Sequence, residues 1–235
     1  MIRDAKGGLF SWLIERYIAR KIRRQFRGVW VRGVLPEPTN GLLVYANHSN
    51  FWDGFVIHQL AQFAGWNAYA LMEEENLQKY PFHTRIGAIG IKRADPKSSL
   101  QTIRYCREVL KRPRAALFIF PEGEISAGQG PLKPLSRGLE VIAKQTAAVN
   151  VPIAIRYAFL EHEYPDVLID VGAPHAATSI EDASVRLNEV WQRVLQARST
   201  EGFRQIARGQ KGIQQSWDAA RRLPAAGVAS ETAHD

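Results

Sequence analysis

LLVYANHSNFWD, residues 42–53, is the stretch that decides the fold of this chain. Its first five residues are almost entirely apolar and follow Asn40-Gly41, a pattern typical of a buried strand that begins after a turn. Polar residues follow at once, so His48 and Asp53 are expected where the strand gives way to a loop or to the start of a helix. Strand ends of this kind carry the ligand-binding and catalytic residues of α/β folds.

His48 and Asp53 suit general base catalysis. A neutral imidazole can accept a proton from a hydroxyl group, and a carboxylate held against its other nitrogen orients the ring and stabilises the imidazolium that forms. The two residues are therefore candidate catalytic residues. Their spacing alone also fits a capping aspartate beside a surface histidine. Other segments of the sequence are therefore needed to distinguish the two interpretations.

Strand patterns alternate with helical patterns along the chain, which predicts a single layered α/β domain with a central mixed sheet flanked by helices. The length of 235 residues fits one such core. The expected strands are 29–34, 41–46, 67–71, 88–91, 115–120, 152–159 and 167–171. The expected helices are 8–27, 54–65, 98–111, 138–146 and 179–197, with a further one at 202–222.

These elements divide the chain into four parts. Residues 1–28 are expected to form an amphipathic helix, 29–200 the main domain, 201–223 a helical extension and 224–235 a disordered tail, because the composition after Pro224 is small and polar. The single cysteine, Cys106, excludes a disulfide framework and is expected to be a buried helix residue. No Cys/His cluster has the spacing of a zinc site, so no metal is expected.

The amino-terminal helix predicts contact with a membrane. The chain has 31 basic and 23 acidic residues, a net charge of +8, and residues 1–35 are especially rich in cations. Apolar residues recur there at helical spacing with arginines between them, which suits an anionic membrane interface better than nucleic acid. Docking of the same helix on the protein's own core is the alternative. No run approaches the roughly 20 apolar residues of a bilayer span, and no signal-peptide cleavage site follows, so we expect a peripheral protein on the cytoplasmic face of the cell membrane.

Three further blocks follow the first in order: IGAIGIKR at 86–93, FPEGEIS at 120–126 and VPIAI at 151–155. Together with NHSNFWD at 47–53 they resemble the N-H-x-x-x-x-D, G-x-I-x-x-x-R, F-P-E-G and V-P-hydrophobic blocks of the glycerolipid acyltransferase superfamily, typified by lysophosphatidate acyltransferase. The resemblance extends over residues 40–160. It implies that residues 29–200 are an acyltransferase domain.

The resemblance implies transfer of a fatty acyl group from an acyl thioester to a lipid hydroxyl, with His48 as general base and Asp53 orienting it. Arg93 would bind the acceptor phosphate, for which a guanidinium is well suited. Glu122 would accept hydrogen bonds from acceptor hydroxyls or from a structural arginine, and Gly123 would let the backbone approach a ligand closely. The donor would be acyl-CoA or acyl carrier protein, an acidic partner that the positive charge would attract. No other cofactor is implied.

The third block departs from the usual family pattern. Glu124-Ile125-Ser126 stands where the family commonly has Thr-Arg-Ser, so Ile125 replaces a basic residue of the acceptor site. Lys133, slightly downstream, is a candidate to compensate, and a lysophospholipid such as lysophosphatidate then remains the expected acceptor. The alternatives are a non-phosphate lipid alcohol, such as a glycolipid or a lyso-aminolipid, and a catalytically silent lipid-binding protein of the same fold.

Overall fold

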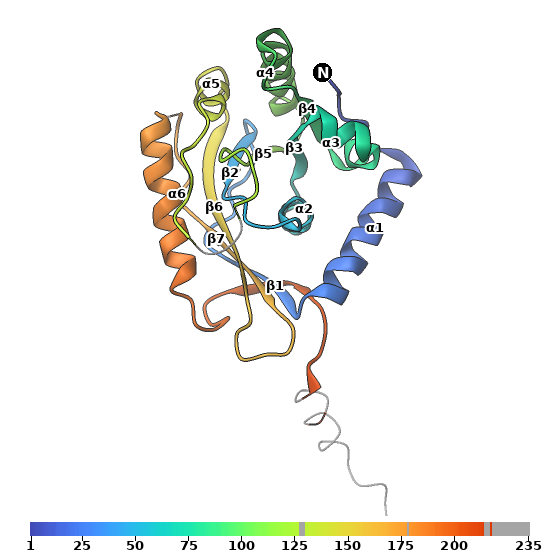
Figure 1. Ribbon diagram of the computed structural model, residues 1–235, viewed down its shortest axis with the longest axis vertical. Coiled ribbons are helices and arrows are strands. Elements are labelled where there is room, and N and C mark those ends of the chain that lie inside the picture. Colours follow the sequence, from blue (N-terminus) through green and yellow to red (C-terminus); the bar gives the residue numbers. More distant parts are fainter. Residues whose placement is uncertain (127–129, 178, 214–216, 218–235) are drawn as a thin grey trace, which may run out of the picture.

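The computed structural model describes residues 1–126, 130–177, 179–213 and 217 (Figure 1). Its centre is one mixed sheet of eight strands in the order β4-β3-β5-β2-β6-β7-β1-β8. Neighbours from β4 to β6 are parallel, as are β7 and β1, whereas β7 is antiparallel to β6 and β8 is antiparallel to β1. The strands are β1 Gly28–Arg32, β2 Leu42–Ala46, β3 Asn67–Glu73, β4 Ala88–Ile91, β5 Ala115–Ile119, β6 Val149–Ala158, β7 Asp166–Val171 and β8 Arg204–Arg208.

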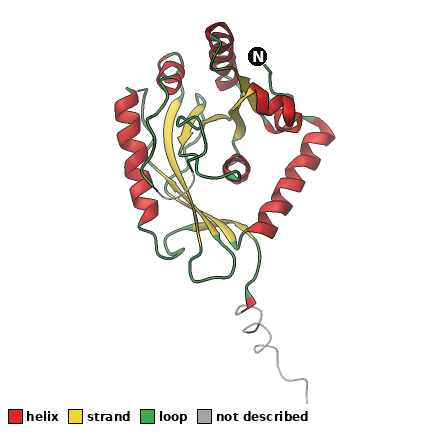
Figure 2. Cartoon of the chain, in the orientation of Figure 1, coloured by secondary structure: helices red, strands yellow, loops and turns green. Residues whose placement is uncertain are grey.

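Helices cover both faces of this sheet (Figure 2). Their bounds are α1 Gly8–Gln25, α2 Asp53–Ala64, α3 Glu74–Lys79, the 3-10 helix η1 Pro81–Ile86, α4 Pro96–Leu110, α5 Gly138–Lys144 and α6 Ile180–Leu195. Because successive strand residues point to opposite faces, β2 contributes Leu42 and Val44 to a core shared with α1 and α2. Its Leu43 and Tyr45 belong to a second core with α4, α5 and α6. A fully buried central strand explains the unbroken apolar run in the sequence.

The predicted fold class is confirmed, and each of the seven expected strands and of the first five expected helices is found within a few residues of its predicted bounds. The helix expected at 202–222 is wrong in its first part, because Arg204–Arg208 form a strand. This strand pairs with β1 at the border of the sheet, and a border strand tolerates a polar sequence because one side faces solvent. Residues 214–216 and 218–235 lie outside the described chain, and with them the predicted tail. The short helices α3 and η1 were not predicted.

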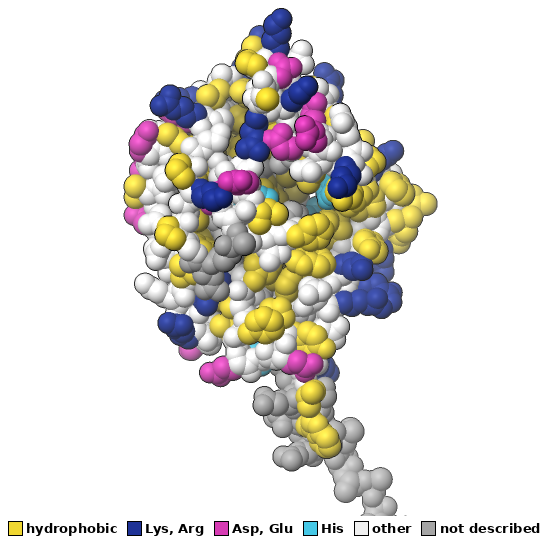
Figure 3. All heavy atoms as spheres, viewed as in Figure 1, with side chains coloured by type: hydrophobic (Ala, Val, Ile, Leu, Met, Phe, Trp, Pro, Cys, Tyr) yellow, Lys and Arg dark blue, Asp and Glu magenta, His cyan; other side chains and the backbone are white. Residues whose placement is uncertain are grey.

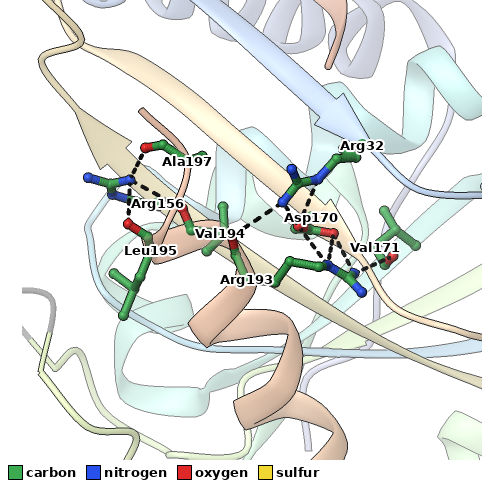
Figure 4. Close-up of polar contacts among 8 residues, drawn as sticks. All are labelled: Arg32, Arg156, Asp170, Val171, Arg193, Val194, Leu195 and Ala197. Carbon is green, nitrogen blue, oxygen red and sulfur yellow. Dashed lines mark hydrogen bonds and ion pairs between the residues drawn. The ribbon is translucent and has the colours of Figure 1, made fainter. Parts of the chain in front are cut away.

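A buried carboxylate ties α6 to strands β7 and β1 of the sheet (Figure 4). Asp170 on β7 is fully buried and lies opposite Arg32 of β1. It pairs with Arg32 and with Arg193 in the last turn of α6, whose Nη2 is 2.5 Å from Asp170 Oδ1. Nearby, Arg156 of β6 donates from Nη1 to the carbonyl oxygens of Val194, Leu195 and Ala197 at the end of α6. The arginines thus fix the end of the helix on the sheet.

Asp170→Ala should lower the free energy of unfolding by about 3 kcal/mol, because it leaves two guanidinium groups facing each other without their shared partner. Glu108→Gln removes a largely exposed pair with Lys111 and should cost less than about 1 kcal/mol. Urea unfolding of both variants checks this. Equal effects of the two substitutions would contradict a structural role for Asp170.

Candidate active site

Asn47 extends the sheet by one position with its side chain. The residue is 1% exposed and directly follows β2. Its amide nitrogen donates to the carbonyl oxygen of Ile155 on β6, at 3.0 Å, and its amide oxygen accepts from the Ile155 N–H, at 2.7 Å. The side chain therefore takes the place of a backbone peptide, and the backbone is free to turn away from β6. This turn sets His48 at the carboxyl end of the parallel strands.

Asp53, the first residue of α2, is fully buried and accepts four hydrogen bonds. Its Oδ2 lies 2.8 Å from His48 Nδ1 and accepts from the backbone N–H groups of Ser49, at 2.8 Å, and Asn50, at 2.9 Å. Its Oδ1 accepts from the Tyr157 hydroxyl at 2.7 Å. The carboxylate therefore holds the loop that precedes α2 and orients the histidine. It does not cap α2, whose N-cap residue is Trp52.

His48 is held by three contacts, two at its ring and one at its backbone. It stacks on Phe120 at the end of β5, with 4.3 Å between ring centroids, and Asp53 engages its Nδ1. Its backbone N–H donates to Glu122 Oε1 at 2.8 Å. His48 lines a cavity, so its second ring nitrogen, Nε2, is the one available to a ligand there.

The cavity has a volume of about 610 Å³ and a largely apolar wall. Its polar groups include His48, Arg93 and Gly123, whereas side chains of β3, α4 and α5 such as Leu71, Ile103 and Ile142 form its interior. Figure 3 shows histidine side chains in a depression of the surface, with hydrophobic side chains beside it. A largely apolar cavity with a few polar groups suits a ligand with a long hydrocarbon part and a reactive head.

Arg93 follows β4 and is held by two neighbours. Its Nε forms an ion pair with Glu73, the last residue of β3, and its Nη2 donates to the carbonyl oxygen of Gly123 at 2.7 Å. Gly123 has a φ of +81°, and a Cβ there would lie 2.1 Å from Arg93 Nη1. The positive φ favours glycine here, and a larger residue would also push the end of the Arg93 side chain aside.

Glu122 and Lys133 are placed differently from the sequence-based expectation. Glu122 holds the loop that follows β5, because its Oε2 accepts from the backbone N–H of Lys133 at 3.0 Å and lies 3.3 Å from the hydroxyl of Ser126. Within the described part of the chain, Glu122 has no arginine among its hydrogen-bond partners. The ammonium of Lys133 pairs with Glu124 at 2.7 Å, and both side chains are exposed. The structure therefore brings His48, Asp53, Arg93, Glu122 and Gly123 together, with only the backbone of Lys133 joined to them.

Two residues of the site were missed by sequence reasoning. Tyr157 lies two positions beyond Ile155 on β6 and so points to the same face. Burial, reinforced by the adjacent Asp53, raises the pKa of Tyr157 well above its ordinary value, so its hydroxyl stays a hydrogen-bond donor. Glu73 is the last residue of β3. Its position at a strand end is the only feature of the sequence that indicates a place in the site. Recognising either residue required knowing that β6 neighbours β2 and that β3 neighbours β4.

Comparison with known proteins identifies the family. A family model described as Acyltransferase matches residues 8–156, so the chain belongs to the Acyltransferase family, and the resemblance stated from the four blocks is confirmed. Similar curated proteins are two chloroplastic 1-acyl-sn-glycerol-3-phosphate acyltransferases. BAT2 of Brassica napus is 29% identical over 63% of this chain and 46% of its own length. LPAT1 of Arabidopsis thaliana is 26% identical over 52% of this chain and 33% of its own. The chain thus spans less than half of either relative.

A solved structure agrees on the fold. The 1-acyl-sn-glycerophosphate acyltransferase PlsC from Thermotoga maritima superposes with a TM-score of 0.57, covering 80% of each chain at 19% sequence identity. At this identity the likeness establishes a shared architecture and no more.

Cys106 is separate from this site. It lies in α4 and is fully buried, and burial raises the pKa of its thiol to about 12. Within the described part of the chain, no group of three or more His, Cys, Asp or Glu residues is arranged to hold a metal ion.

A thiol reagent should therefore fail to label Cys106 in the native protein at pH 8, because the thiolate that reacts forms in quantity only near pH 12. The same reagent should label one thiol per chain in denaturant. Absorbance after addition of an aromatic disulfide reagent measures both. Rapid labelling of the native protein would contradict the burial of this side chain.

Proposed function

We propose that this protein transfers a fatty acyl group from an acyl thioester to a hydroxyl of a lysophospholipid such as lysophosphatidate. The observation that carries the proposal is the pair His48–Asp53, which opens onto an apolar cavity with Arg93 among its polar groups. The names of the curated relatives agree with this choice of acceptor.

In the proposed reaction, Nε2 of His48 removes the proton of the acceptor hydroxyl as its oxygen attacks the thioester carbonyl. The tetrahedral intermediate then expels the thiolate, and the imidazolium returns the proton to the sulfur. Asp53 stabilises the imidazolium and keeps Nδ1 engaged throughout. A base of this kind typically contributes about 10² to 10⁴ in rate. Transfer is direct, because the Ser49 hydroxyl, the nearest nucleophile in the sequence, is buried without a hydrogen-bond partner.

The cavity would hold the hydrocarbon part of the lipid substrates, because its apolar interior excludes water from the acyl chain. The donor would be acyl-CoA or acyl carrier protein, which both present a thioester and negative charge to a chain of net charge +8. No further cofactor is needed for this chemistry. The intact pair of His48 and Asp53 disfavours the alternative of a catalytically silent lipid-binding protein.

The protein would act at a membrane surface through α1, on the cytoplasmic face of the cell membrane. Ile18 and Ile22 of α1 are buried against the sheet core, so this helix docks on the domain. The opposite side of α1 exposes aromatic and aliphatic side chains, and cationic side chains lie near them (Figure 3). The exposed apolar residues are Leu9, Phe10, Trp12, Leu13 and Tyr17. Such a surface suits the boundary between lipid headgroups and acyl chains. Among the described residues, no helix has the length and apolar character to cross a bilayer.

His48→Ala should reduce acyl transfer by at least about 10²-fold, because it removes the proposed general base. Asp53→Asn should also lower turnover by about 10²-fold or more, through loss of the orienting charge. Tyr157→Phe should have a smaller effect, since the Asp53–His48 contact remains. Initial rates with labelled acyl-CoA and lysophosphatidate measure all three.

Ser49→Ala is the matched control and should retain transfer, because its hydroxyl has no hydrogen-bond partner. Melting temperatures establish that each variant folds. Rates close to those of the unchanged protein in His48→Ala would overturn the mechanism.

The triple variant Leu9→Ser, Phe10→Ser, Leu13→Ser should bind anionic vesicles less tightly than the unchanged protein. Point changes are preferred to deletion of residues 1–27, because α1 also contributes to the core. Raised salt should weaken the electrostatic part of binding, which is screened beyond about 10 Å at 0.1 M, and leave an apolar remainder. Co-sedimentation with vesicles provides the measurement.

Leu100→Ser with Val185→Ser serves as the control, since these exposed apolar residues lie on α4 and α6. If the triple variant binds as tightly as the control, α1 is only a core element.

A further inference from the structure

The guanidinium of Arg93 is engaged at two of its three nitrogens, and its side chain is about half exposed. Its Nε is paired with Glu73 and its Nη2 with the carbonyl oxygen of Gly123. The third nitrogen, Nη1, lies so close to Gly123 that a Cβ there would be 2.1 Å away. A bidentate contact with phosphate needs two N–H groups on one edge of the guanidinium. A phosphate group that binds along the edge formed by Nε and Nη2 must therefore displace Glu73.

The charged residues around Arg93 also disfavour the binding of a phosphate group. Among the described residues that line the cavity, Glu73 and Arg93 are the only members drawn from Asp, Glu, Lys and Arg, and they neutralise each other. Just outside the cavity, Lys133 is paired with Glu124. The pKa of the Glu124 carboxyl is lowered by Lys133 and also by Arg93. Ile125, half exposed, adds an apolar side chain to the cavity wall. An incoming phosphate monoester would therefore meet cations that already have carboxylate partners.

We propose that Glu73 determines acceptor selectivity: by holding Arg93 in an ion pair, it weakens the binding of phosphate-bearing acceptors relative to acceptors with an uncharged head group. This inference rests on the proposed acyl transfer and refines its substrate class. Glu73 contacts Arg93 and not the reacting atoms, so it acts on the acceptor through the guanidinium. Its side chain is about one-third exposed, so water moderates the effect without removing it.

The test compares two acceptors that differ only in the phosphate, lysophosphatidate and monoacylglycerol, with one acyl thioester in mixed micelles. Glu73→Gln keeps the shape of the side chain and removes its charge. The ratio of kcat/KM for lysophosphatidate to kcat/KM for monoacylglycerol should rise about 3- to 10-fold in this variant, through a lower KM for lysophosphatidate. Glu75→Gln makes the same change of net charge at an exposed residue outside the cavity lining and should leave the ratio unchanged.

An unchanged ratio in Glu73→Gln would overturn the proposal. A fallen ratio would also overturn it, because Glu73 would then position Arg93 for phosphate binding. A second measurement does not depend on turnover: lysophosphatidate is titrated calorimetrically into His48→Ala protein with and without Glu73→Gln. The Kd should fall about 3- to 10-fold with Glu73→Gln, and an equal Kd would contradict the proposal. Absence of transfer to either acceptor by the unchanged protein would contradict the proposed function instead, and the two Kd values would still decide the role of Glu73.

Discussion

The buried carboxylate of Asp53 is the group on which the arrangement of the site depends. Its two oxygens join three parts of the chain: the loop after β2 through backbone N–H groups, the His48 ring, and Tyr157 of β6. A fully buried carboxylate is tolerated only where hydrogen bonds replace its lost hydration. Here the replacement comes from two backbone N–H groups, the His48 ring and the Tyr157 hydroxyl. The same bonds that make the burial of Asp53 possible therefore also orient the His48 ring.

The parallel strands supply the other half of the site. β2, β3, β4 and β5 lie side by side, so the segments after their carboxyl ends meet at one edge of the sheet. His48, Glu73, Arg93 and Phe120 arrive there from positions far apart in the sequence. The helices α4 and α5 leave an apolar cavity behind this edge. A single topology thus brings the histidine, the arginine and the apolar cavity together, and the superposition on PlsC shows the same fold.

Much of this arrangement could be predicted from the sequence, for identifiable reasons. An apolar run such as Leu42–Ala46 indicates a strand directly, and the order of four short blocks placed His48, Asp53, Arg93 and Gly123 in one site. Partners set by strand order could not be predicted: Tyr157 and Glu73 matter only because β6 and β3 lie where they do. Arg204–Arg208 were expected to be helical because a polar strand at a sheet border shows no apolar alternation. Lys133 was expected to bind an acceptor, but its ammonium pairs with Glu124, a contact that depends on the path of the loop.

Asp53 should fix His48 with its proton on Nδ1 and with Nε2 free to accept a proton. Asp53 Oδ2 already accepts two backbone N–H groups and so acts as an acceptor toward the ring. Nitrogen NMR of protein labelled in its histidine side chains tests this directly, with a His48→Gln sample to assign the signals. The account predicts that, in the neutral ring, Nδ1 of His48 has the shift of a protonated nitrogen and Nε2 that of an unprotonated one. A proton on Nε2, with Nδ1 unprotonated, would contradict it.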